Sequence, residues 1–190
     1  MNNPNDTPYV TKQQDARGVV TLTLNRPQQY NALSEGMLDA LQAELDALAH
    51  DESARVVVLA ATGRAFCAGH DLKEMRADPS HSYYRKLFTQ CGDVMMAVQK
   101  LPIPMIAQVQ GIATAPGCQL VAMCGLAVAA DTATLAVGGG NPGPLCPTPS
   151  APLGRKLGRK QARGMRLAGG LHRPQRGEAG RITHARRRTR

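Results

Sequence analysis

Residues 55–61, with the sequence RVVVLAA, contain a continuous run of apolar side chains. Such a run predicts a strand covered on both faces, which is typical of a parallel sheet flanked by helices. Before it, residues 18–25 (GVVTLTLN) alternate apolar with polar side chains, as a half-buried strand does. Between the two, residues 34–48 carry apolar side chains at spacings of three and four, which predicts an amphipathic helix capped by Ser34. This order of strand, helix and strand predicts a layered α/β fold.

The same kind of pattern continues to residue 137 and then changes. Further helices are expected at 81–99 and 118–123, and further strands at 105–109, 126–130 and 134–137. Residues 138–153 are rich in proline and glycine, and residues 155–190 contain many arginines and only one acid, Glu178. The formal net charge of +9 therefore belongs to the C-terminal part of the chain.

Two loops of small residues, 62–69 and 111–117, each follow a predicted strand and lead into a predicted helix. Small residues let a ligand approach the backbone, and N–H groups at a loop-to-helix junction can bind a developing oxyanion. Most glycine-rich turns of this kind are nevertheless structural. Taken alone, the pattern does not assign a site.

Three motifs in and before these loops carry a more specific signal. They read LNRP and NAL within residues 24–33, GRAFCAGHDLKEM at residues 63–75 and VQGIATAPGCQLVAMC at residues 109–124. In this order and spacing they resemble the signature series of the enoyl-CoA hydratase/isomerase (crotonase) family, over about residues 10–168. The resemblance implies the crotonase (ClpP-like) fold, a spiral of repeated ββα units. It also implies an acyl-CoA thioester as the substrate, with coenzyme A as part of that substrate and no separate cofactor or metal.

The resemblance also implies the residues of the site. The thioester oxygen would lie between two backbone N–H groups, one from His70 and one from the position held here by Pro116. The segment from Gln28 to Ala32 would lie along the CoA moiety. Lys73 could reach a CoA phosphate, although a solvated helix charge explains this residue equally well. The acyl-CoA site would be lined by Ala68, Gly69, His70, Asp71, Leu72 and Lys73.

The chain departs from the family at its catalytic positions. Hydratases of the family use two glutamates, and the equivalent positions here are Gln119 and Gly140. Neither residue can exchange a proton near neutral pH. Pro116 has no N–H to donate, so the N–H of Gly117 is the available substitute. Two interpretations stay open: an active hydratase or isomerase, and an acyl-CoA-binding pseudoenzyme with little activity.

Residues 1–168 are expected to form one crotonase-like acyl-CoA-binding domain, and residues 169–190 a basic, disordered tail. Members of the family tend to form trimers or hexamers through C-terminal helices, which are not recognisable here and are expected to be truncated or disordered. The composition of the tail is what a shifted reading frame in GC-rich coding sequence would produce, a hypothesis that the gene's other frames would test. Binding of nucleic acid by the tail is the most distant alternative, because no recognition motif or aromatic residue accompanies its charges.

The sequence also leads to expectations about the cellular location of the protein and the reactivity of its cysteines. No apolar run approaches the roughly 18 residues of a membrane span, the N-terminus is polar, and the five cysteines fit a reducing compartment. The cytoplasm is therefore expected. Cys67 could act as a nucleophile only with a base such as His70, and a buried, inert thiol is the favoured interpretation.

Overall fold

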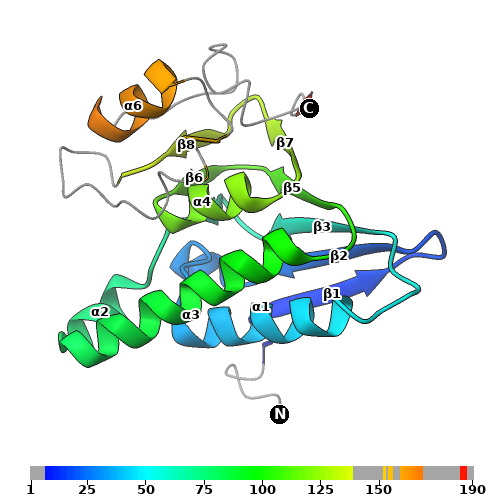
Figure 1. Cartoon of the computed structure of the whole chain (residues 1–190), viewed down its shortest axis with the longest axis horizontal. Helices are drawn as coiled ribbons and strands as arrows, with labels where there is room; N and C mark the ends of the chain where they lie inside the picture. Colours follow the sequence, from blue (N-terminus) through cyan, green and yellow to red (C-terminus); the bar gives the residue numbers. More distant parts are fainter. Residues whose placement is uncertain (1–6, 139–151, 153, 156–158, 169–184, 188–190) are drawn as a thin grey trace.

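The structure is a computed structural model that describes residues 7–138, 152, 154–155, 159–168 and 185–187. Among these residues, six strands form the main sheet in the order β1-β2-β3-β5-β7-β9, and three strands form a smaller sheet in the order β4-β6-β8 (Figure 1). In the main sheet β1 is antiparallel to β2, and every other neighbouring pair is parallel. The strands are β1 (Val10–Gln14), β2 (Val19–Leu24), β3 (Val56–Ala61), β4 (Ala65–Cys67), β5 (Met105–Val109), β6 (Ile112–Thr114), β7 (Leu126–Ala130), β8 (Thr134–Ala136) and β9 (Ala185–Arg187).

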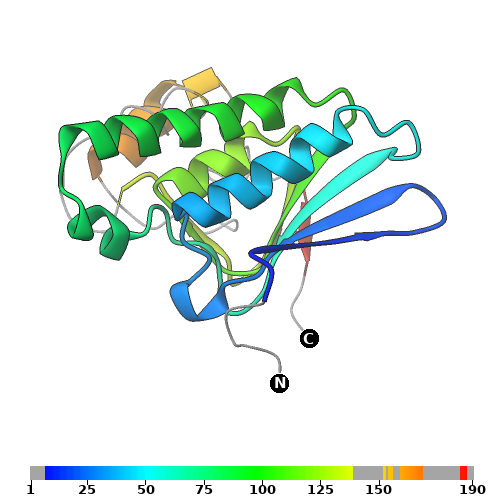
Figure 2. The same cartoon turned by 90° about the horizontal axis from the view of Figure 1, so that it is seen from below.

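Helices cover one face of the main sheet, as the view from below shows (Figure 2). Within the described chain they are the 3-10 helix η1 (Pro27–Gln29) and the α-helices α1 (Glu35–Leu48), α2 (Leu72–Ala77), α3 (His81–Lys100), α4 (Pro116–Met123) and α6 (Arg159–Ala168). α1 and α3 pack side by side. The predicted α/β class is confirmed.

The first strands and the first helix follow from the periodicities of the sequence. The side chains of β2 alternate between buried and half-buried, so its period of two is confirmed. At the start of α1, the Ser34 hydroxyl accepts a hydrogen bond from the Met37 N–H at 3.2 Å, as the predicted cap requires. The buried face of α1 consists of Met37, Leu38, Leu41, Leu45 and Leu48.

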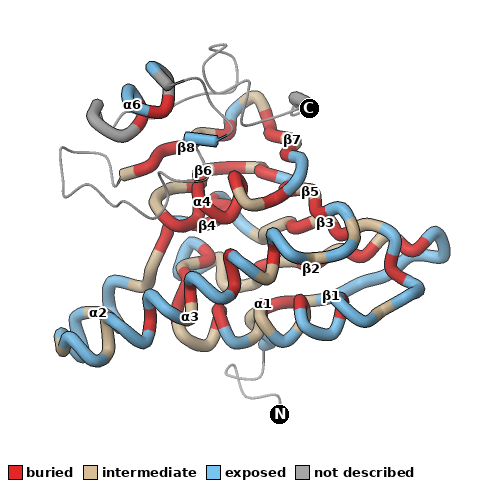
Figure 3. The backbone as a smooth tube through the Cα atoms, in the orientation of Figure 1, coloured by how far each residue is buried: buried red, intermediate tan, exposed pale blue. Residues whose placement is uncertain are grey.

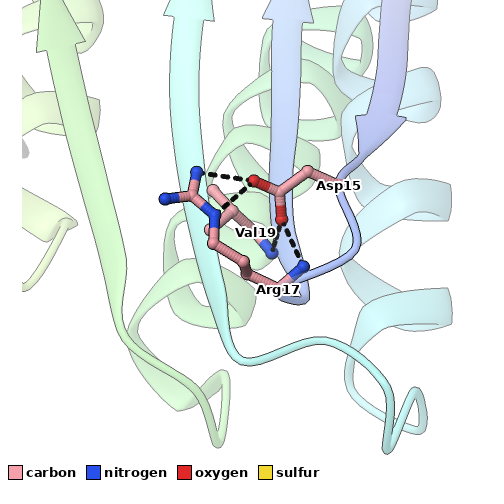
Figure 4. Close-up of polar contacts among 3 residues, drawn as sticks. All are labelled: Asp15, Arg17 and Val19. Atoms are coloured by element: carbon pink, nitrogen blue, oxygen red, sulfur yellow. Dashed lines mark hydrogen bonds and ion pairs between the residues drawn. The ribbon is translucent and has the colours of Figure 1, made fainter.

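The turn between β1 and β2 is closed by Asp15 (Figure 4). Its carboxylate accepts hydrogen bonds from the backbone N–H groups of Arg17 (2.9 Å) and Val19 (3.0 Å). The Arg17 guanidinium donates to the same carboxylate, and these hydrogen bonds lower the pKa of Asp15. Gly18 completes the turn at φ +79°, a conformation that glycine adopts without strain.

The expectation for β3 was wrong in one respect. Val57 and Leu59 are fully buried, but Val56 and Val58 on the opposite face are only half-buried. The described helices cover one face of the sheet, and Figure 3 shows that the strands around β3 are not buried along their whole length. The continuous apolar run therefore correctly indicates a strand here, but the strand is buried on one face only.

The smaller sheet brings the two loops of the predicted site together. β4 and β6 are parallel neighbours, with Cys67 opposite Ala113. Gly111 fits against the chain before β4, because a Cβ at this position would lie 1.9 Å from the Arg64 carbonyl oxygen. Gly117 fits equally closely after β6, where a Cβ would lie 2.3 Å from the Cys67 carbonyl oxygen. Only glycine permits backbones to approach this closely.

The C-terminal part of the chain contributes two described elements. α6 packs Ala162 and Met165 into the core. β9 pairs in parallel with β7, with Ala185 opposite Val128. Residues 185–187 are therefore ordered as a strand, whereas the sequence was expected to be disordered after residue 169. The physical reason is that an open strand edge offers N–H and C=O groups to any extended segment, whatever its side chains. The domain boundary at residue 168 stays a prediction.

None of the helices in the described ranges has the length and apolar character needed to cross a bilayer.

Candidate functional site

The loop after β4 and the loop after β6 lie in direct contact. The Thr114 hydroxyl donates a hydrogen bond to the Ala68 carbonyl oxygen at 3.0 Å. A Cβ on Gly69 would lie 3.2 Å from Ala115 Cβ and 3.3 Å from Pro116 Cδ. The structure thus brings together the two segments from which the sequence analysis drew its oxyanion donors.

The first loop is held by backbone hydrogen bonds that leave one amide unused. Ala68 N–H donates to the Tyr30 carbonyl oxygen (3.1 Å), and Leu33 N–H donates to the Gly69 carbonyl oxygen (2.7 Å). The Gly69 N–H is directed to the Cys67 sulfur. In the described part of the chain, the N–H of His70 has no acceptor. It is therefore free to bind a ligand oxygen.

The second loop enters α4 through a strained residue. Ala115, the N-cap of α4, has φ 50° and ψ −127°, a region that residues with a Cβ rarely occupy. Its carbonyl oxygen accepts from Cys118 N–H (3.0 Å) and Gln119 N–H (3.1 Å). Gly117 lies in the first turn, where N–H groups have no partner within the helix, and no described residue accepts from it. This second amide is also free.

Pro116 is the first residue of α4 and is buried. In proline, Cδ occupies the position of the amide hydrogen, and here Cδ lies against Gly69. The predicted oxyanion position therefore presents a methylene group to the neighbouring loop. The structure agrees with the expectation that Pro116 is no donor and that Gly117 offers the nearest N–H along the chain.

Gln119 is almost fully buried, with 9% of its surface exposed, and lines a cavity of about 660 Å³. Its amide can hold a water molecule but cannot exchange a proton. Gly140, the second position expected to replace a glutamate, lies outside the described residues. The apolar wall of the cavity is formed mainly by Met95, Met96, Val98, Leu101, Ile103, Met105 and Met123.

A smaller pocket of about 250 Å³ lies beside the NAL segment. Of the predicted CoA-binding residues, Ala32, Asp71 and Lys73 line it, whereas Gln28 and Leu72 are exposed and do not. The complete lining is Tyr9, Arg26, Gln29, Ala32, Ser34, Asp71, Lys73 and Glu74.

Arg26 in this pocket was not singled out by the sequence analysis. Its guanidinium lies 3.8 Å from the centre of the Tyr9 ring, a cation–π contact that holds the side chain in place. Its Nε is buried without a hydrogen-bond partner among the described residues. The signal that could have identified it is its place in the LNRP motif.

Asn31 was also missed as a residue with a role of its own. It is fully buried at φ 53°, and its side-chain oxygen accepts from Arg26 N–H at 2.8 Å. Its amide group donates to the carbonyl oxygens of Thr62 and Ala65, each at 2.9 Å. The first of these hydrogen bonds closes the LNRP–NAL segment on itself, and the other two join it to the chain that leads to His70.

Cys67 and His70 do not form a nucleophile–base pair. Cys67 is fully buried, and burial raises the pKa of its thiol to about 12. His70 Nδ1 lies 3.4 Å from the Leu33 carbonyl oxygen instead. The expected burial of Cys67 is confirmed, and its inertness stays a prediction. In the described chain no group of three or more His, Cys, Asp or Glu residues is arranged to bind a metal ion.

The structure is an α/β protein in which two loops in contact each carry a backbone N–H without an acceptor among the described residues. The sequence model of the enoyl-CoA hydratase/isomerase family matches residues 14–182, so the similarity extends past residue 168, where it was expected to end. The chain belongs to this family.

Curated relatives include enoyl-CoA hydratase domain-containing protein 3, mitochondrial. The Xenopus laevis protein is 44% identical over 163 residues, covering 86% of this chain and 55% of the relative. The human protein is 39% identical over 162 residues, covering 85% of this chain and 54% of the relative. The chain spans about half the length of these relatives.

Solved structures agree with the fold. The crystal structure of enoyl-CoA hydratase from Mycobacterium smegmatis superposes with a TM-score of 0.90 at 56% identity, covering 95% of this chain and 70% of that one. Human enoyl coenzyme A hydratase domain-containing protein 3 superposes with a TM-score of 0.87 at 35% identity, covering 94% and 70%. The predicted crotonase fold is confirmed.

The curated relatives are named as mitochondrial proteins, which contradicts the cytoplasmic location expected from the sequence. That expectation depended on free cysteines and on a polar first segment. Free cysteines do not distinguish one compartment without disulfides from another, so they could not support the assignment.

Proposed function

We propose that this chain binds acyl-CoA thioesters and holds the thioester oxygen on the backbone N–H groups of His70 and Gly117. The observation that supports this is the contact between the two loops together with the absence of an acceptor for either N–H among the described residues. Free N–H groups are costly to bury without a partner, and they stabilise negative charge on a ligand oxygen.

The two cavities suit the two ends of such a ligand. The charged pocket offers Arg26 and Lys73, whose cationic groups can bind the phosphates of coenzyme A. The apolar cavity beside Gln119 can accept an acyl chain. Coenzyme A enters as part of the substrate, with no additional cofactor in the proposal.

Hydration is the step for which the site is least equipped. Gln119 cannot act as a general acid or base, and each such group typically contributes about 10²–10⁴-fold to the rate. We therefore expect binding of 2-enoyl-CoA with slow hydration. Turnover of crotonyl-CoA, followed by the loss of enoyl absorbance, separates an active hydratase from a binding protein.

Binding itself is tested by thermal denaturation with increasing acetyl-CoA or crotonyl-CoA. A ligand of the folded state raises the Tm in proportion to the logarithm of its concentration once the site is saturated. Lys73→Ala should weaken binding of both thioesters by about 5- to 10-fold, the effect of one exposed charged contact. Lys100→Ala, at the end of α3, is the matched control and should bind as the wild type does. No shift with any thioester would refute the proposed function.

A further inference from the structure

The apolar cavity beside Gln119 lies between two helices that pack against each other, α3 and α4 (Figure 1). Its α3 wall includes Gly92, Met95 and Met96, and its α4 wall consists of Gln119, Ala122 and Met123. The Gly117 N–H lies in the first turn of the same α4 helix. A ligand oxygen at that amide and an apolar chain in the cavity would therefore contact one and the same helix.

Gly92 is an unusual residue for its place in the fold. It lies in the middle of α3, where glycine is destabilising relative to alanine. A Cβ at Gly92 would meet no atom of the described residues within 4 Å, so no packing contact explains the glycine. At Gly111, by contrast, a Cβ would lie 1.9 Å from the Arg64 carbonyl oxygen, and the fold itself requires glycine. Gly92 thus leaves open space on the wall of the cavity.

The residues around this open space suit a hydrocarbon chain. Met95 and Met105 are almost fully buried, and the flexible methionine side chain adapts its shape to an apolar neighbour. Among the described residues of the lining, Arg155 is the only charged one, and it is exposed. The volume of about 660 Å³ is in the range of cavities that enclose whole small-molecule ligands. A short acyl group, such as acetyl or crotonyl, would leave most of it unfilled.

We propose that Gly92 determines the acyl-chain length that this site accepts, by leaving room between α3 and α4 for an unbranched chain of the octanoyl or decanoyl class. The inference rests on the proposed function, because it needs the thioester at the two loops and the acyl chain in the cavity. A larger side chain at this position narrows the cavity, since Gly92 is part of its wall.

Burial of the chain gives the expected dependence on length. Each methylene removed from water tightens binding by up to about fourfold. The affinity of the wild type should therefore increase from acetyl-CoA to octanoyl-CoA and decanoyl-CoA. Gly92→Leu should bind acetyl-CoA as the wild type does and decanoyl-CoA at least about tenfold more weakly, because the new side chain displaces two or more methylenes from the cavity.

The experiment is calorimetric titration of each protein with acetyl-, octanoyl- and decanoyl-CoA. Gly92→Leu should fold, because leucine favours helix more than glycine does and the space at this position is open. Gly92→Ala adds a single methyl group and should lose about two- to fourfold in affinity for decanoyl-CoA, so it keeps the test valid if the larger variant does not fold.

Gly164→Leu is the matched control. Gly164 is an exposed glycine of α6 at which a Cβ would also meet no described atom within 4 Å, but it does not line the cavity. This variant should keep the chain-length dependence of the wild type.

Three results would overturn the role of Gly92 while leaving thioester binding intact. They are equal affinity of the wild type for acetyl-CoA and decanoyl-CoA, an unchanged length dependence in both Gly92 variants, and the same loss in Gly92→Leu as in Gly164→Leu. Failure of the wild type to bind any of the thioesters would overturn the proposed function, and this inference with it.

Discussion

Pro116 replaces an N–H with a methylene group at the start of α4, directly against Gly69. Pro116→Ala restores the N–H while keeping a Cβ and the helical start. Because one oxyanion donor typically contributes about 10²–10³-fold to the rate, we expect any hydration of crotonyl-CoA to become faster by that factor. Steady-state rates with crotonyl-CoA measure the effect. Pro79→Ala, in the exposed loop before α3, should leave the rates unchanged, and an equal rise in both variants would disprove the explanation.

Ala115 holds a backbone conformation that favours glycine, with φ 50° and ψ −127°. Ala115→Gly should relieve strain of about 1–3 kcal/mol, partly offset by the greater freedom of glycine in the unfolded chain. The expected net gain in unfolding free energy is about 1 kcal/mol, measured by urea denaturation. Ala113→Gly, at a buried position of β6, is the control and should be destabilising. A loss of stability in Ala115→Gly would contradict the strain.

The sequence motifs identified His70, Pro116 and Gly117 because each lies in a short pattern that can be recognised locally. The roles of Arg26 and Asn31 were not predicted. The hydrogen bonds of Asn31 reach Thr62 and Ala65, more than thirty positions along the chain. Such bonds depend on how distant segments meet, which no local pattern of residue types encodes.

At the scale of elements, one short segment is fixed from both sides. Ala68 and Gly69 are held by the backbone of Tyr30 and Leu33 on one side and by the Thr114 hydroxyl on the other. The position of the His70 N–H, the next amide along the chain, is therefore set by the segment between η1 and α1 and by β6.

Thr114→Val removes the hydroxyl and keeps the shape of the side chain. The Ala68 carbonyl oxygen loses its 3.0 Å donor, so the unfolding free energy should fall by about 1–2 kcal/mol, and acyl-CoA should bind more weakly. Chemical denaturation and thioester titration measure the two effects. Thr62→Val removes a comparable hydrogen bond to the Leu24 carbonyl oxygen at 3.2 Å. It should lose similar stability but bind acyl-CoA normally; equal loss of binding in both variants would contradict a specific role for Thr114.

The elements themselves were predicted unevenly. α3 ends one residue beyond its predicted limit of 99, because the amphipathic pattern extends over most of its length. β4 and β6 were expected to be loops and are strands of three residues each. Three residues are too few for a period of two to be detected, so the strands become visible only through their neighbours in the smaller sheet.

At the scale of the whole molecule, the main sheet joins segments from both parts of the chain. β1 lies at one edge and β9 at the other, so residues near the C-terminus cover the outer side of β7. Covering a strand edge satisfies its backbone groups and prevents pairing with another molecule.

Deletion of residues 185–190 should therefore uncover β7. We expect a loss of about 1–3 kcal/mol in unfolding free energy from the missing backbone hydrogen bonds, together with concentration-dependent association. Denaturation and light scattering measure these effects. Deletion of residues 188–190 alone leaves β9 in place and serves as the control. If both truncated proteins behaved alike, the pairing of β9 with β7 would contribute nothing in solution.

The close backbone approach at Gly111 and Gly117 has a practical consequence for directed evolution of this scaffold. A side chain at Gly111 would collide with the Arg64 carbonyl oxygen and one at Gly117 with the Cys67 carbonyl oxygen, so mutant libraries that randomise these positions will consist mostly of misfolded protein. Diversity is better placed at Pro116 and Gln119, where a new amide or a carboxylate can be introduced without separating the two loops.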